Sequence, residues 1–139
     1  MTGKWRDAMI AADTNVLVRL LTGDEPRQEA AAQALLAGGE PIWIAKTVLL
    51  ETGWVLRSLY GLDESAIRGA FTKLLGVRNV RVEDQASVAA ALALTSHGIE
   101  LADAMHLSSR MDGAAFVSFD KVLVQRARRT GVTDISALT

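Results

Sequence analysis

The chain has 139 residues, of which 50% are hydrophobic and 22% charged, and its formal net charge at pH 7 is −1. This length and composition predict one folded domain with a real core and exclude a disordered chain. The absence of cysteine excludes disulfides, thiolate zinc sites and cysteine nucleophiles. No apolar run approaches the ~20 residues of a membrane helix, and no signal peptide pattern opens the chain. We therefore expect a cytoplasmic protein that has no membrane partner.

The spacing of apolar residues and the positions of capping residues predict seven helices. In chain order they cover residues 14–22, 27–37, 47–60, 63–75, 83–97, 101–111 and 121–130. Short apolar segments of strand length lie between them, at 8–12, 41–45, 114–119 and, more weakly, 132–135. The segment 79–82 fits a turn between two helices as well as a short strand. Residues 1–8 are expected to be an N-terminal extension, and residues 9–139 a single domain.

The alternation of these strands and helices indicates the fold class. Strands that are apolar without alternation are typical of a parallel sheet that is buried on both faces. Strand and helix alternate from one end of the chain to the other, which predicts a doubly wound α/β fold.

Two aspartates directly follow predicted strands. Asp13 comes after the segment ending at Ala12, and Asp120 after the segment ending at Phe119. Ligands of open parallel sheets bind beyond the carboxyl ends of the strands, so both side chains are expected at the edge of the sheet where a site would lie. Each Asp also precedes a helix, where capping alone would explain it.

A third acidic residue, Glu51, lies on the helix predicted for 47–60. Its helical neighbours Val48, Trp54 and Val55 are apolar, so it is expected to point along an apolar face. A glutamate in such a place needs a partner. Either Arg57 or a lysine pairs with it, or it is a ligand of a metal ion.

Asp103 falls in the first turn of a predicted helix, where the helix dipole stabilises an anion. Glu100 stands three residues earlier on the same face, and two like charges at that spacing repel each other. A cation would relieve this repulsion. His106, one turn further on, is expected to have a packing or surface role.

Taken together, the four acids Asp13, Glu51, Asp103 and Asp120 predict a metal site. Several carboxylates that converge on one point cannot all ionise unless a cation holds them. Oxygen ligands of high charge select Mg²⁺ or Mn²⁺ over zinc, and a magnesium site of this kind is typical of phosphoryl chemistry. The chain contains no glycine-rich phosphate loop and no serine hydrolase motif that would indicate other chemistry.

Four short blocks of the sequence resemble the signature blocks of PIN-domain ribonucleases, in the same order and with similar spacing. They are Ala12-Asp13-Thr14-Asn15-Val16-Leu17, Leu50-Glu51-Thr52, Ala102-Asp103-Ala104-Met105-His106 and Ser118-Phe119-Asp120. The short single-domain form is similar to the VapC-like toxins of bacterial toxin–antitoxin pairs. The resemblance implies a three-layer α/β/α sandwich with a short, mostly parallel central sheet.

The resemblance also implies a function: Mg²⁺- or Mn²⁺-dependent hydrolysis of RNA phosphodiester bonds, inhibition by a cognate antitoxin, and a homodimer. It assigns the four acids to catalysis and metal binding, with Asn15 and Ser118 supporting the first and fourth. Glu100 stands where the family often has aspartate, so it is expected to be either a ligand or a support.

Two alternatives remain open. A catalytically degenerate member of the family would only bind RNA or an antitoxin. A phosphatase would use Asp13 as its nucleophile, but such enzymes require a second aspartate two residues further on, where this chain has Asn15.

Overall fold

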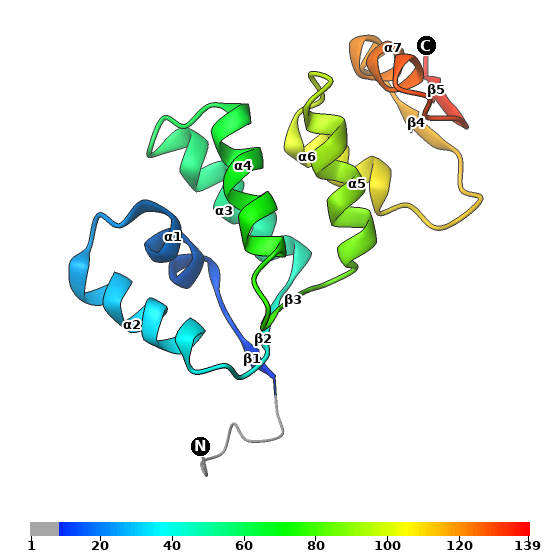
Figure 1. Ribbon diagram of the computed structural model, residues 1–139. Helices are drawn as coiled ribbons and strands as arrows, with labels where there is room; N and C mark the ends of the chain where they lie inside the picture. The colour runs from blue at the N-terminus through cyan, green and yellow to red at the C-terminus, as the bar shows by residue number, and fades with distance from the viewer. Residues whose placement is uncertain (1–8) are drawn as a thin grey trace. The chain divides into compact units, whose positions relative to one another are not determined.

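The structure is a computed structural model that describes residues 9–139 (Figure 1). These residues form two compact units, 9–85 and 86–139, and each is described by itself. The expected N-terminal extension, residues 1–8, lies outside the described residues, as does the first position of the strand expected at 8–12. A single domain over residues 9–139 stays a prediction.

The first unit is a parallel three-stranded sheet flanked by helices. Its elements are β1 (Ile10–Ala11), α1 (Thr14–Thr22), α2 (Pro26–Ala37), β2 (Ile42–Ile44), α3 (Lys46–Ser58), α4 (Glu64–Leu75) and β3 (Val80–Val82). The strand order is β1-β2-β3, with Ile10 opposite Ile42 and Ile44 opposite Val82. Because all three strands are parallel, their carboxyl ends meet at one edge of the sheet, from which α1 and α3 begin.

The sequence of α1 explains why it forms where it does. The side chain of Asp13 accepts hydrogen bonds from the backbone N–H groups of Asn15 (3.1 Å) and Val16 (3.4 Å), which no residue of the helix itself can satisfy. The helix ends at Gly23, whose φ of 65° is a left-handed conformation that glycine adopts without steric cost. Leu17 and Val18, on the inner face, are buried in the core.

The core of the first unit lies between the sheet and its helices. Ile44 from β2, Leu56 from α3 and Phe71 from α4 are each at most 1% exposed. Burial of one such side chain contributes roughly 1.5–3 kcal/mol to stability. This packing fixes the ends of β1 and β2, from which the candidate site residues of this unit project.

The second unit contains α5 (Gln85–Thr95, beginning one residue before the unit), α6 (Leu101–Ser108), β4 (Phe116–Ser118), α7 (Lys121–Arg129) and β5 (Ile135–Ala137). Strands β4 and β5 are parallel, with Phe116 opposite Ile135. Helix α7 packs on both strands and buries Leu123, Val124 and Ala127. The candidate residues of this unit stand at the beginnings of α6 and α7.

The α/β fold with parallel strands and flanking helices is confirmed, and each of the seven expected helices is present. The segment 79–82 forms a strand, because residues 80–82 pair with β2. Glu83 was expected to begin the fifth helix. Instead its N–H donates to the carbonyl of Ile44 (2.9 Å), which continues the sheet by one residue.

Two expectations about strands were wrong. The last strand is Ile135–Ala137 and not 132–135, because residues before Ile135 form a turn in which Asp134 has a φ of 54°. The strand expected at 114–119 is not buried on both faces, since Val117 is 53% exposed. A two-stranded sheet covered by a single helix has too few neighbours within the unit to bury it. None of the helices in the described residues has the length and apolar character needed to span a membrane.

Candidate functional site

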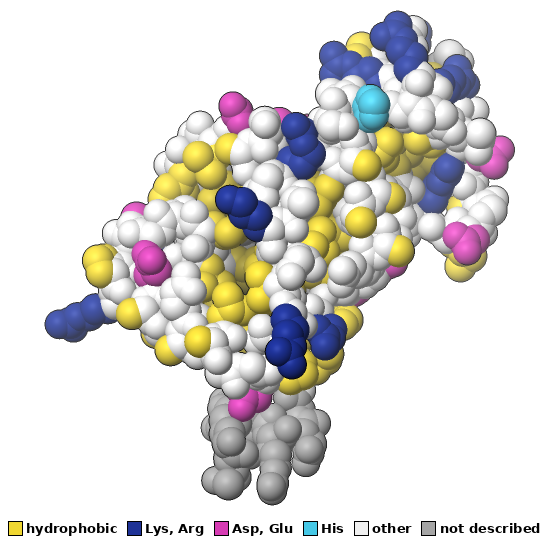
Figure 2. All heavy atoms as spheres, viewed as in Figure 1, with side chains coloured by type: hydrophobic (Ala, Val, Ile, Leu, Met, Phe, Trp, Pro, Cys, Tyr) yellow, Lys and Arg dark blue, Asp and Glu magenta, His cyan; other side chains and the backbone are white. Residues whose placement is uncertain are grey.

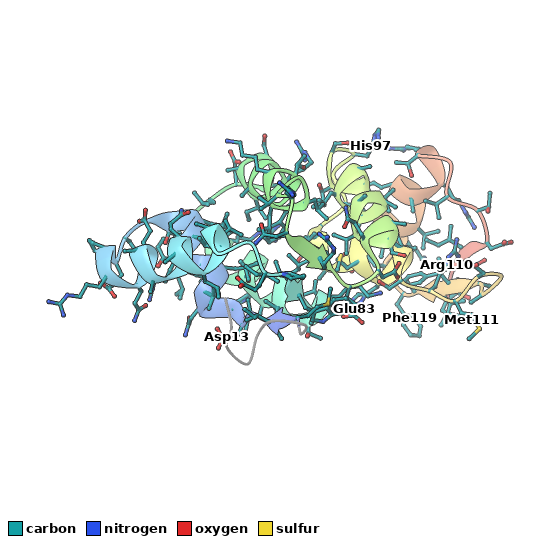
Figure 3. The ribbon with its side chains drawn as sticks, turned by 60° about the horizontal axis from the view of Figure 1, so that its bottom comes forward. Asp13, Glu83, His97, Arg110, Met111 and Phe119 are labelled. Atoms are coloured by element: carbon teal, nitrogen blue, oxygen red, sulfur yellow. The ribbon has the colours of Figure 1, made fainter. Side chains whose placement is uncertain are left out.

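Asp13 stands at the carboxyl end of β1 and is exposed, pointing away from the ribbon (Figure 3). One of its carboxylate oxygens, Oδ1, accepts both hydrogen bonds that cap α1. The side chain therefore caps the helix and still presents an oxygen to solvent. Capping and a ligand role are compatible in this geometry.

Glu51, on α3, is joined to the beginning of α1 by a hydrogen bond. The hydroxyl of Thr14 donates to its Oε1, and Thr14 itself is 9% exposed. The bond brings Glu51 to the residue next to Asp13. In the first unit, these two acids thus lie at neighbouring positions of the same sheet edge.

The expectation that Glu51 points along an apolar face was wrong, because the side chain is exposed. Arg57, one of the partners considered for Glu51, forms an ion pair with Glu64. Helix α3 buries the face that carries Leu49, Thr52, Gly53 and Leu56, so Glu51 and Trp54 are turned outward.

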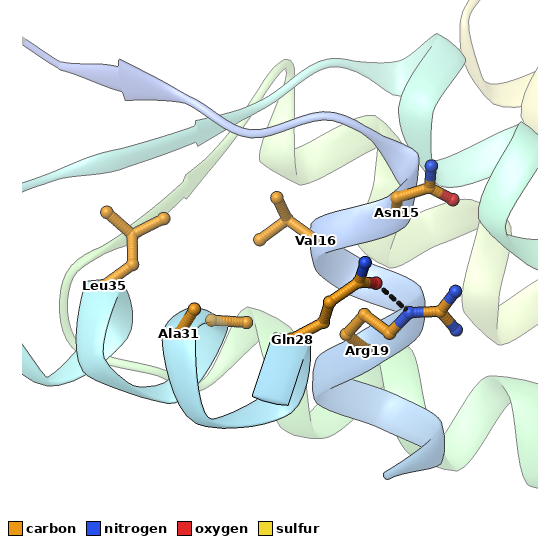
Figure 4. Close-up of a pocket in the computed structure, with 7 residues that line it drawn as sticks. Asn15, Val16, Arg19, Gln28, Ala31 and Leu35 are labelled. Atoms are coloured by element: carbon orange, nitrogen blue, oxygen red, sulfur yellow. Dashed lines mark hydrogen bonds between the residues drawn. The ribbon is translucent and has the colours of Figure 1, made fainter. Parts of the chain in front are cut away.

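A pocket of about 470 Å³ opens between α1 and α2 (Figure 4). Asn15 and Arg19 contribute polar groups to it, and the Nε of Arg19 donates to Oε1 of Gln28 (2.6 Å). Its remaining lining is apolar: Val16, Ala31, Ala32 and Leu35. The side chain of Asn15 thus lines this pocket, while its backbone N–H is the group that bonds Asp13.

In the second unit, Asp120 follows β4 and caps α7. Its Oδ1 accepts a hydrogen bond from the N–H of Leu123 (3.0 Å). Its own N–H donates to Oγ of Ser118 (3.0 Å), so Ser118 fixes the turn that aims the aspartate. The side chain of Asp120 is exposed.

Asp103 and Glu100 meet Asp120 in a pocket of about 180 Å³ at the beginnings of α6 and α7. Burial raises the pKa of the half-buried Asp103 carboxyl above its ordinary value, and the charges of Glu100 and then Asp120 raise this pKa further, while His106 lowers it. The second unit therefore gathers three acids closely enough that their charges oppose one another.

The pocket's fourth charged residue is basic. Arg126, on α7, also lines the pocket, and its Nη1 donates to the carbonyl of Gly98 (2.8 Å). The side chain of Arg126 is exposed, and it lines the pocket together with the three acids.

The acids have the ligand chemistry that Mg²⁺ or Mn²⁺ prefers, and a cation at the second unit's pocket would offset the repulsion that raises the pKa of Asp103. No group of three or more acidic or histidine side chains in residues 9–139 is gathered tightly enough to hold a metal ion as it stands. The carboxylates of the pocket are thus near one another without forming a chelating set. Asp13 and Glu51 belong to the first unit, Asp103 and Asp120 to the second.

Sequence reasoning missed the parts played by Thr14 and Arg126. The sequence did contain a signal for Thr14, because it directly follows Asp13 on the first turn of a helix. A hydroxyl that is buried there needs a hydrogen-bond partner. No sequence signal identified Arg126, because its contact with Gly98 joins residues 28 positions apart.

Comparison with known families gives one finding. The PIN domain family matches residues 10–129, which is most of the chain and includes all four acids. No curated protein matches the sequence. PIN domains are a family of nucleases that typically depend on a metal ion, commonly Mg²⁺. On the strength of this match and of the parallel α/β architecture, the chain belongs to the PIN domain family.

Proposed function

We propose that this protein is a metal-dependent endoribonuclease that hydrolyses RNA phosphodiester bonds. The observation that carries the proposal is the pocket of the second unit, where Glu100, Asp103 and Asp120 come together at two helix N-termini. Membership of the PIN domain family supports it, since the matched region contains the four acids. A protein that only binds RNA has no need of carboxylates, because they repel the phosphate backbone.

The residues have separate roles in this proposal. Asp13, Glu51, Asp103 and Asp120 hold Mg²⁺ or Mn²⁺, which when bound lowers the pKa of a water molecule and offsets phosphate charge. Thr14 and Ser118 hold Glu51 and Asp120 in place through the hydrogen bonds described above. Asn15, whose backbone N–H binds Asp13, supports the first acid, and Glu100 is either a further ligand of the ion or a support of Asp103.

The experiment is cleavage of end-labelled RNA with Mg²⁺, with Mn²⁺ and with EDTA. We expect cleavage with either metal and none in EDTA. The products should carry a 3′-hydroxyl and a 5′-phosphate, because water attacks the phosphorus in place of the ribose 2′-hydroxyl. Full activity in EDTA, or a 2′,3′-cyclic phosphate product, would refute the mechanism.

Three matched substitutions separate catalysis from helix capping. Asparagine caps helices about as well as aspartate, so Asp13→Asn and Asp120→Asn keep the caps and remove a charge. Asp63→Asn is the control, because Asp63 caps α4 through the N–H of Ala66 (2.8 Å) and is not among the four acids. We expect the first two variants to lose at least about 100-fold in kcat/KM, an effect of the size seen when an important catalytic group is removed, and the control to stay within about two-fold.

The same assay distinguishes the alternatives. A degenerate member of the family would bind the RNA without cleaving it in any metal. A phosphatase that uses Asp13 would hydrolyse small phosphomonoesters and leave the RNA backbone intact.

The biological role that we propose is that of a toxin inhibited by a cognate antitoxin. The apolar pocket between α1 and α2 supports this, since it suits the apolar face of a partner helix. A second pocket, between α1, α2 and α4, carries Leu20 and Leu21, and Trp54 on α3 is 62% exposed. Expression of the chain should arrest growth, and co-expression of a small protein encoded beside its gene should relieve the arrest. Size-exclusion chromatography with light scattering tests the homodimer that the family implies.

A further inference from the structure

The three arginines in the last turn of α7 differ in what they contact. Lys and Arg side chains gather around this helix (Figure 2). Arg128 is held by a hydrogen bond from its Nη2 to the carbonyl of Ile135 (2.9 Å), and Arg129 is exposed. Arg126 alone of the three lines the pocket that contains Glu100, Asp103 and Asp120.

The position of Arg126 is set by the turn that precedes α6. Gly98 has a φ of 81°, a left-handed conformation that turns its carbonyl toward α7. The Nη1 of Arg126 donates to this carbonyl (2.8 Å). A side chain at position 98 would come into van der Waals contact with the guanidinium, so the arginine lies beside the glycine. The group is therefore anchored at one nitrogen, on a residue that lines the same pocket as the three acids.

A guanidinium has five N–H donors, and the bond to Gly98 uses one of them. Within residues 86–139, Arg126 forms no ion pair with Asp103 or Asp120. The remaining donors form a planar fork that matches the oxygens of a phosphate, which a lysine cannot reproduce. An RNA strand that approaches this pocket is repelled by three carboxylates, and a fixed cation at the same wall offsets that repulsion.

We propose that Arg126 binds a phosphate of the RNA strand at the carboxylate pocket and so positions the strand for cleavage. This inference rests on the proposed ribonuclease function and adds a residue to it that the acidic signature does not contain. Arg126 acts by holding the substrate and takes no part in bond making or breaking.

The test is the salt dependence of RNA cleavage by Arg126→Gln at saturating Mg²⁺. Glutamine keeps an amide donor for the carbonyl of Gly98 but removes the charge, so it separates a structural role from phosphate binding. We expect kcat/KM to fall by about 10- to 100-fold, with most of the loss in KM. The slope of log kcat/KM against log salt should become shallower by about 0.7, the value for one phosphate contact on a single strand. Arg126→Lys, which restores the charge, should restore that slope.

Arg129→Ala is the matched control, because it removes the same charge from the same helix outside the pocket. It should keep kcat/KM within about two-fold of the parent. A folded Arg126→Gln variant with the parental kcat/KM and salt slope would overturn the proposal while leaving the nuclease function standing. If the parent protein itself does not cleave RNA with Mg²⁺ or Mn²⁺, the proposed function fails, and this inference fails with it.

Discussion

The surroundings of Asp103 disfavour its charge. Burial is the largest cause of its raised pKa, and the charges of Glu100 and Asp120 add to it. Because its pKa is higher in the folded protein than in the unfolded chain, folding favours the protonated form. Its contribution to stability is fully present below the unfolded-state pKa and is lost as the pH rises through the folded-state pKa.

This linkage predicts the effect of Asp103→Asn on the protein in EDTA. At pH 7 the variant should melt at a higher temperature than the parent, because the disfavoured charge has been removed. Below the ordinary pKa of aspartate, the difference should disappear. Thermal melts across this pH range measure it, with Asp112→Asn as the control, since Asp112 is an exposed acid of the same unit. A lower melting temperature for Asp103→Asn at pH 7 would contradict the prediction.

At the scale of elements, one arginine joins the two loops of the second unit that flank its sheet. The guanidinium of Arg110, which is labelled in Figure 3, donates to the carbonyls of Ala114 (3.2 Å), Thr133 (2.8 Å) and Asp134 (2.8 Å). The first carbonyl precedes β4 and the other two precede β5. The side chain therefore sets the register in which the two strands begin to pair.

We expect Arg110→Ala to weaken the β4–β5 sheet. Three carbonyls lose a charged donor, and although water replaces part of it, the free energy of unfolding should fall by about 1–3 kcal/mol. Urea unfolding measures this loss, and hydrogen exchange of the Phe116 and Leu138 amides, which bond across the strand pair, locates it. Arg129→Ala, which removes a charge without such bonds, should change the free energy by less than about 0.5 kcal/mol. Equal losses for both variants would show that Arg110 has no special role.

At the scale of the whole molecule, the proposed metal site makes the stability of the protein depend on Mg²⁺. A ligand that binds only the native state stabilises it by RT ln(1 + [L]/Kd), which is about 2.7 kcal/mol at 100 times Kd. If acids from both units hold the same ion, Glu51→Gln in the first unit and Asp120→Asn in the second should each reduce the rise in melting temperature on adding Mg²⁺.

Thermal melts with and without Mg²⁺ measure this effect, and Asp63→Asn provides the control with a parental response. If Glu51→Gln leaves the Mg²⁺-dependent rise in melting temperature unchanged and Asp120→Asn abolishes it, the ion is held by the second unit alone. No rise in the parent at millimolar Mg²⁺ would count against the site.

The sequence by itself determined the elements and the family. The seven helices were predicted because helix periodicity and capping depend on residues within a few positions of one another, as in the cap that Asp13 gives to α1. The α/β class followed from the alternation of these helices with apolar segments. The four acidic blocks identified the PIN family, which the match over residues 10–129 confirms, whereas a toxin role stays a prediction.

Only the tertiary structure decided the contacts that join distant residues. Glu51 was expected on an apolar face, but its hydrogen-bond partner is Thr14, 37 positions away. The segment 79–82 contains a strand because residues 80–82 pair with β2. The last strand begins only at Ile135, after a turn whose Asp134 carbonyl accepts a hydrogen bond from Arg110. Arg126 is held at the acidic pocket by its hydrogen bond to the carbonyl of Gly98. Local sequence patterns cannot predict these contacts. The free energy of each contact depends on two groups that come within hydrogen-bond distance only in the folded chain.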